Sequence, residues 1–160
     1  MKRLNVLCVD DQREVLAVLR KDLDVFSEVC RITDCESAAE ALEVMEALDA
    51  RGERVALIIC DHVMPGKNGI EFLIDVHHDD RFTHTRKLLI TGLATHQDTI
   101  VAINEADIDR YIEKPWDLSL LHQSVKALVT RFVLDEGIDY QPYLRFLDHD
   151  TLFRELRKRG

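Results

Sequence analysis

Several patterns that define common classes of protein are missing from this sequence. The first apolar run begins at Leu4 and is interrupted by Asp10, which makes it too short for a signal-peptide core or a membrane span. The four cysteines form no CxxC pair, so zinc sites and disulfides are disfavoured and reduced core thiols are favoured. No internal repeat or low-complexity tract is present. These absences favour a cytoplasmic globular protein.

Positive charge is also scarce. The chain has 21 lysines and arginines against 30 aspartates and glutamates, which gives a formal net charge of −9. Phosphate backbones and anionic membranes repel such a surface, so we expect neither direct nucleic-acid binding nor membrane binding. With 160 residues and 46% hydrophobic content, the chain can form one sizeable core. We therefore expect one domain with an appendage.

Apolar, strand-like runs alternate with helix-periodic segments as far as about Leu134. This alternation is typical of a parallel sheet with helices on both faces. The expected strands are about Leu4–Val9, Val29–Thr33, Val55–Cys60, Lys87–Thr91 and Arg110–Glu113. The sequence therefore predicts an α/β fold, a doubly wound five-stranded parallel sheet.

Local signals mark the ends of the helices between these strands. Ser37 and Glu40 have the spacing of a capping box, and Gly52 marks the end of the helix that they begin. The MPGKNG segment, with two glycines and a proline, predicts a sharp turn before a helix at about Gly69–Val76. Asp117 is expected to cap the last helix of the alternating region.

Polar residues follow the predicted strands at their carboxyl ends. Asp10 and Asp11 follow the first strand and Asp61 follows the third, while Thr91 ends the fourth and Lys114 comes after the fifth. These ends meet at one edge of a parallel sheet, where open α/β folds bind ligands. Neighbouring carboxylates repel one another unless a cation lies between them, and hard oxygen ligands suit Mg²⁺. Together with a hydroxyl and an ammonium group, they predict phosphoryl transfer to an aspartate.

From Lys2 to Leu134 the chain resembles the response regulator receiver domain of bacterial two-component signalling. The resemblance is carried by VDD at Asp10–Asp11, DHVMPGKNG from Asp61, LLITG containing Thr91, and YIEKP containing Tyr111 and Lys114. It implies a flavodoxin-like strand order 2-1-3-4-5 with a short helical C-terminal extension. The stretch between Asp11 and Asp61 is slightly long for the family, and the extra residues fall most naturally in ALDARGERV.

The resemblance also implies a role for each matching residue of the site. It makes Asp61 the phosphoacceptor and Lys114 the lysine that contacts the phosphate. It places Mg²⁺ among Asp10, Asp11, Asp61 and the backbone carbonyl of Val63. Such a domain catalyses its own phosphorylation and dephosphorylation and is not a conventional turnover enzyme.

The switch and the partners are implied in the same way. Thr91 is the switch hydroxyl, and Tyr111 is the aromatic residue that turns inward when Thr91 moves toward the phosphoryl group. The element that shifts with them is expected to include Gly92–Ala106. The phosphodonor would be a histidine kinase or a histidine phosphotransfer protein. A homodimer could form through the face of the fourth helix, fifth strand and fifth helix.

Two other functions compete with this interpretation. A Mg²⁺-dependent phosphohydrolase of the haloacid-dehalogenase kind would also form an aspartyl phosphate, but it needs an acid two residues after the nucleophile. Val63 occupies that position. A pseudo-receiver that only docks partners is the third possibility, and the complete set of acids with Thr91 and Lys114 argues against it.

The alternating pattern ends at Leu134, so we predict a receiver domain at 1–134 and a C-terminal extension at 135–160. The extension is expected to form two short amphipathic helices and to act as an interaction segment or a linker to an output module. It is too short to bury its apolar residues within a core of its own, and we expect them to need another surface. These residues are Tyr143, Phe146, Leu147, Leu152, Phe153 and Leu156.

Overall fold

The fold is built on one sheet of five parallel strands. A computed structural model describes residues 2–92 and 96–160. The strands run in the order β2-β1-β3-β4-β5. Their bounds are β1 Leu4–Val9, β2 Cys30–Cys35, β3 Val55–Cys60, β4 Arg86–Thr91 and β5 Arg110–Glu113. The predicted fold class and strand order are confirmed.

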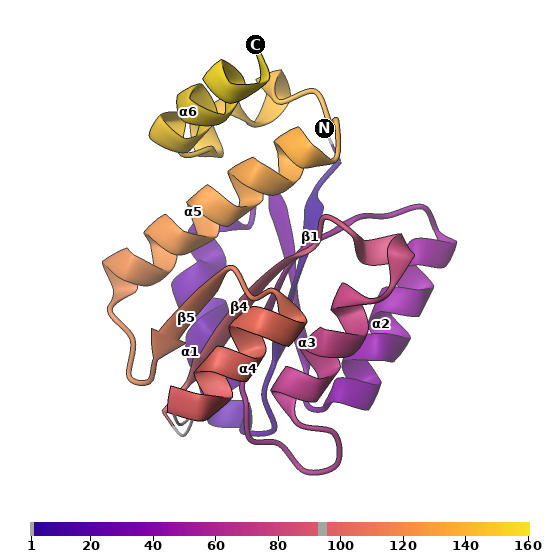
Figure 1. The fold of residues 1–160 in the computed structure, drawn as a ribbon. Helices are drawn as coiled ribbons and strands as arrows, with labels where there is room; N and C mark the ends of the chain where they lie inside the picture. Colours follow the sequence, from indigo (N-terminus) through magenta and orange to yellow (C-terminus); the bar gives the residue numbers. More distant parts are fainter. Residues whose placement is uncertain (1, 93–95) are drawn as a thin grey trace.

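Helices cover both faces of the sheet (Figure 1). One face carries α1 (Arg13–Leu23) and α5 (Leu118–Asp135). The other carries α2 (Ala38–Ala50), α3 (Gly69–His77) and α4 (His96–Ala106). Three short 3-10 helices are η1 (Asp24–Phe26), η2 (Asp80–Phe82) and η3 (Gln141–Phe146), and α6 (His149–Arg159) packs on α5. Each face of the sheet therefore has its own apolar core layer.

The two strands that carry acids at their ends lie at the centre of the sheet. Every residue of β1 and of β3 is buried, as their continuous apolar runs predict. Because β1 and β3 are adjacent and parallel, their carboxyl ends lie side by side. The sheet order thus fixes the position of the acids before any side chain is considered.

Three predicted boundaries differ from the structure. The second strand was expected at Val29–Thr33 but is Cys30–Cys35, because its residues pair in parallel with the whole of β1. This is an edge strand, which tolerates the partly exposed polar residues Thr33 and Asp34. β4 begins at Arg86, one residue early, and α3 extends to His77, one residue late.

The helix caps follow the sequence with one change. The Ser37 side chain accepts a hydrogen bond from the Glu40 amide, as predicted, but the Glu40 carboxylate accepts from the Glu36 amide instead of the Ser37 amide. A complete capping box forms instead at Asn68 and Glu71, which begin α3. The Asp117 side chain caps α5 through the Leu120 amide.

The four cysteines are free and buried, each within a strand. Burial raises the pKa of the Cys30 and Cys35 thiols to about 12. These side chains are protonated core groups at neutral pH, in agreement with the expectation of reduced thiols.

The residues after Leu134 pack on the same domain. Tyr143, Leu147 and Leu152 are buried, and Tyr143 and Leu147 belong to the core layer beneath α1 and α5. These three residues do use a surface outside the extension, as expected, and the long α5 helix of the same domain supplies it. Phe153 does remain on the surface, with 58% of it exposed.

Polar contacts hold this extension in place. The Tyr143 hydroxyl donates to the carbonyl oxygen of Lys2 at 2.6 Å, and the Asp148 amide donates to the Thr130 hydroxyl oxygen at 2.9 Å.

In the described part of the chain, no helix combines the length and the apolar character that a membrane crossing requires.

Candidate functional site

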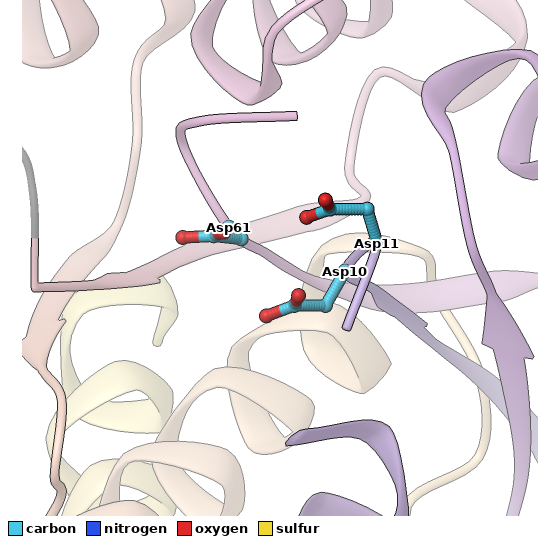
Figure 2. A group of neighbouring side chains, drawn as sticks. All are labelled: Asp10, Asp11 and Asp61. Atoms are coloured by element: carbon cyan, nitrogen blue, oxygen red, sulfur yellow. The ribbon is translucent and has the colours of Figure 1, made fainter. Parts of the chain in front are cut away.

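Three carboxylates gather where β1 and β3 end. Asp10 and Asp61 are buried, at 0% and 5% exposure, while Asp11 is exposed. Each offers one ligand oxygen, and these oxygens all lie within 4.8 Å of one another. Figure 2 shows the three side chains coming from the two neighbouring strand ends and extending toward the same side. The carboxylates predicted from strand ends therefore form one cluster.

Lys114 reaches this cluster from the end of β5. Its Nζ donates to Asp10 Oδ2 at 2.7 Å and lies 3.5 Å from Asp61 Oδ1. The first contact is a hydrogen bond, and the second is an ion pair without hydrogen-bond geometry. One ammonium group cannot neutralise three carboxylates, so the site keeps an excess of negative charge.

One oxygen of the Asp61 carboxylate is available for a further ligand. Its Oδ1 is buried and accepts no hydrogen bond from the described residues, with the Lys114 ammonium as its ion-pair partner. A buried acceptor without a hydrogen bond costs free energy, which a metal ion or a phosphoryl group can recover. Clustered carboxylate oxygens are the donor set that suits Mg²⁺.

The loop after Asp61 approaches α3 so closely that one position must be glycine. A Cβ atom added at Gly69 would lie 1.7 Å from the backbone oxygen of Asp61. The Gly69 amide also donates to the carbonyl oxygen of His62 at 2.7 Å. Gly66, with φ at +79°, makes the turn that MPGKNG predicts. Sequence reasoning gave both glycines a turn role and missed the packing role of Gly69.

Two residues next to Asp61 contrast in exposure. Val63 is 49% exposed and carries no group that could transfer a proton. The His62 side chain is only 12% exposed, and its Nδ1 lies 3.9 Å from Asp98 Oδ2 in the first turn of α4. His62 thus links the loop after Asp61 to α4, a contact that the sequence did not indicate.

Thr91 and Tyr111 also meet. Thr91 is fully buried at the end of β4, and its carbonyl oxygen accepts a hydrogen bond from the Tyr111 hydroxyl at 3.3 Å. Burial raises the pKa of the Tyr111 phenol, with a smaller contribution from the charge of Glu113. Of the stretch expected to shift with them, residues 93–95 lie outside the described residues.

A tryptophan ties the Lys114 loop to α1. Trp116 follows the cis Lys114–Pro115 bond, and its Nε1 donates to Asp22 Oδ2 at 2.8 Å. His122 Nε2 donates to the carbonyl oxygen of Asp22. The chain that carries Lys114 is therefore fixed on both sides, by β5 and by α1.

Comparison with known proteins gives the same family for most of the chain. Residues 6–126 match the response regulator receiver domain family. The hydrogenase transcriptional regulatory protein HoxA of Cupriavidus necator is 38% identical over 128 residues, which are 80% of this chain and 24% of that protein. The chemotaxis protein CheY of Pseudomonas aeruginosa is 26% identical over 80% of this chain and 98% of its own length.

Solved structures agree in fold. The signal receiver domain of an HD domain-containing protein from Pseudomonas fluorescens has a TM-score of 0.76 at 25% identity, and the match covers 86% of this chain and 94% of that one. Two HoxA proteins are among the curated relatives, and the matches to this chain cover only 24% and 25% of their lengths. The chain belongs to the response regulator receiver domain family, whose members act as phosphorylation-dependent signalling switches of two-component systems.

Proposed function

We propose that Asp61 is the phosphoacceptor of this receiver. The observation that carries the proposal is the buried Asp61 Oδ1, which accepts no hydrogen bond from the described residues and lies 3.5 Å from the Lys114 ammonium. A nucleophile needs an available oxygen lone pair beside a cation that can receive phosphoryl oxygens. Asp10 lacks this freedom, because its two oxygens accept from the Gln12 amide and from Lys114.

The proposed step transfers one phosphoryl group. An Asp61 carboxylate oxygen attacks phosphorus and forms the new P–O bond of an acyl phosphate. The bond between phosphorus and the donor breaks, and its electron pair leaves with the donor. With phosphohistidine as donor the imidazole nitrogen keeps that pair, and with acetyl phosphate the acetate oxygen does. Lys114 offsets the charge on the transferred oxygens.

Mg²⁺ fits the same residues. We assign its ligands to Asp10, Asp11, Asp61 and the backbone carbonyl of Val63. When bound, a divalent ion supplies positive charge that lets an anionic donor approach three carboxylates. The chain's own residues position the acids from two strand ends and hold Asp10 with Lys114, so little rearrangement is needed for binding.

We also propose that Thr91 and Tyr111 form the switch. A phosphoryl group on Asp61 adds strong acceptor oxygens, and the Thr91 hydroxyl would move toward them. Such a movement would disturb the Thr91 carbonyl that now holds the Tyr111 hydroxyl. The His62–Asp98 contact also connects α4 to the loop after Asp61. Phosphorylation would shift the populations of two arrangements of these residues.

The partners follow from this role. We propose a histidine kinase or a histidine phosphotransfer protein as phosphodonor. We also propose that the protein signals in the cytoplasm by binding a partner.

We propose further that residues 1–134 form the receiver domain and residues 135–160 an extension. Self-association would use the α4-β5-α5 face or the extension, where Phe153 is exposed. Light scattering with and without beryllofluoride tests whether phosphorylation changes the oligomeric state.

Intact-mass measurement after incubation with acetyl phosphate and Mg²⁺ tests the acceptor. The parent chain should gain one phosphoryl group, and Asp61→Asn should gain none. Asp75→Asn is the matched control, because Asp75 is an exposed acid on α3 paired with Lys67. It should be labelled like the parent. Labelling of Asp61→Asn at the parent's rate, or labelling unaffected by a metal chelator, would contradict the assignment.

The phosphohydrolase alternative is disfavoured by the structure around Val63. This exposed apolar side chain cannot protonate a leaving group. Incubation with a panel of phosphomonoesters separates the two functions. A receiver should release no phosphate catalytically, whereas multiple turnovers that depend on Asp61 would favour the hydrolase.

A further inference from the structure

A basic pocket lies at the edge of the sheet opposite the Asp61 site. It has a volume of about 510 Å³. Its charged lining consists of Lys2, Arg3, Arg31, Arg51, Glu53 and Arg54. Five cations and one carboxylate give it a formal charge of +4, within a chain whose net charge is −9. Five of the chain's 21 lysines and arginines thus line one pocket.

The guanidinium groups keep most of their donors available. Glu53 accepts from Arg31 Nη1 at 3.0 Å and from Arg51 Nε at 2.8 Å, so one carboxylate fixes two arginines. Arg54 donates through Nε to Glu136. Each arginine carries five N–H donors, and in the described structure each uses one side-chain nitrogen. The remaining donors can bind an anion.

Two further cations of the pocket form no ion pair with the described acids. Within residues 2–92 and 96–160, no carboxylate forms an ion pair with Lys2 or Arg3. The backbone that carries them is nevertheless fixed, because the carbonyl oxygen of Lys2 accepts from the Tyr143 hydroxyl and Leu4 begins β1. Unpaired cations on a fixed backbone favour binding of an anion, because little backbone order has to be gained.

The receiver function does not account for this pocket. The strands are parallel, so the beginnings of β1 and β3 lie at the opposite edge from their acidic ends. Arg51, Glu53 and Arg54 come from ALDARGERV, the stretch that is long for the family. Tyr143 comes from the segment after Leu134 and also lines the pocket.

We propose that this pocket binds a small anion with two or more linked phosphate groups, either free pyrophosphate or a nucleoside polyphosphate. Planar guanidinium groups bind phosphate oxygens through paired hydrogen bonds. The pocket volume is in the range of sites for small ligands. A polynucleotide would extend beyond the hollow onto a surface that is negative overall, which repels it.

Calorimetric titration of the full chain with pyrophosphate, without divalent ions and at constant ionic strength, tests the proposal. Saturable binding is expected. Replacing both unpaired cations, Lys2→Gln with Arg3→Gln, should weaken it by about tenfold or more. The matched control is Arg154→Gln with Arg157→Gln, which removes two exposed cations from α6 and should leave the affinity unchanged. Arg51→Gln provides a third variant if the first fails to fold.

Further titrations identify the ligand and separate the two sites. Asp61→Asn should bind pyrophosphate like the parent, because the acidic site lies at the other edge. Tighter binding of ATP than of pyrophosphate would identify a nucleotide, and equal binding would identify the pyrophosphate group alone. The proposal is overturned by the absence of saturable binding, by equal weakening in both double variants, or by a single-stranded oligonucleotide binding more tightly than pyrophosphate.

Discussion

The phenol of Tyr111 donates a hydrogen bond to the backbone carbonyl oxygen of Thr91 over 3.3 Å. The Lys114 amide donates to the same oxygen at 3.4 Å. One carbonyl group therefore connects the hydroxyl of the proposed switch tyrosine with the backbone amide of the proposed phosphate-binding lysine. A displacement of Thr91 would change the hydrogen bonds of both Tyr111 and Lys114. These bonds therefore couple the proposed switch residues physically.

Tyr111→Phe should remove this hydrogen bond and keep the ring. The free energy of unfolding should fall by about 1 kcal/mol, the usual net contribution of one such bond. Amide exchange of β4 and β5 should also respond less to beryllofluoride, because one of the two connections is lost. Tyr140→Phe is the control, since the Tyr140 hydroxyl forms no hydrogen bond among the described residues. Equal loss of stability in both variants would contradict the prediction.

Gly69→Ala should disrupt the acceptor loop. The added Cβ would lie 1.7 Å from the Asp61 carbonyl oxygen, and overpacking of this kind costs about 1–3 kcal/mol. Phosphorylation from acetyl phosphate should slow because Asp61 itself must move. In Gly92→Ala the new Cβ would be 3.6 Å from the Lys114 oxygen, an ordinary contact. That variant should fold with nearly the parent's stability, as urea unfolding will show.

Alkaline pH should destabilise the chain through its buried thiols. Burial raises the pKa of the Cys30 and Cys35 thiols in the folded state to about 12, from 9.0. Above about pH 9 the unfolded chain releases these protons and the folded chain keeps them. The stabilisation is therefore complete below pH 9 and is lost as the pH rises toward 12. In that window each thiol should lower the free energy of unfolding by about 1.4 kcal/mol per pH unit.

Urea unfolding between pH 7 and pH 11 measures this slope. Cys30→Ala should make the slope shallower by the share of one thiol, and the difference between variant and parent should grow with pH. A stability that stays constant from pH 8 to pH 11 would show that the thiols titrate alike in the folded and unfolded states.

Leu152→Ala and Phe153→Ala should differ although the residues are neighbours on α6. Leu152 is 1% exposed and Phe153 is 58% exposed. Removing the buried leucine side chain should cost about 2–5 kcal/mol, and removing the exposed phenylalanine about 0.5 kcal/mol or less. Thermal unfolding of both variants provides the measurement. Similar melting temperatures would mean that α6 does not belong to the cooperative domain.

The arrangement of the site was largely predictable because a parallel sheet imposes it. Apolar runs ending in Asp10 and Asp61 predict adjacent strand ends, and the structure brings these acids together with Lys114. Asp10, Asp61 and Lys114 are far apart in the sequence, and the sheet topology brings them together. The Gly69 contact was not predictable, because a glycine in a turn usually indicates backbone conformation and gives no sign of a close approach from elsewhere.

The extension shows where prediction from the sequence ends. The helical segments after Leu134 were expected, and α6 and η3 are present. Their packing partner was not evident, because an amphipathic pattern states that an apolar face is buried but not against what. The basic pocket is a second example, since Lys2, Arg31 and Arg51 are far apart in the sequence.

The sequence by itself determined the strands, the fold class and the kinds of group at the strand ends, because hydrophobic periodicity and strand-end chemistry are local properties. Only the tertiary structure decided the pairing of Lys114 with Asp10, the hydrogen bond from Tyr111 to the Thr91 carbonyl, and the burial of Leu152 on α5. Each of these depends on distances between residues that are far apart in the chain. Such distances are set by how the strands and helices pack together, which no local pattern encodes.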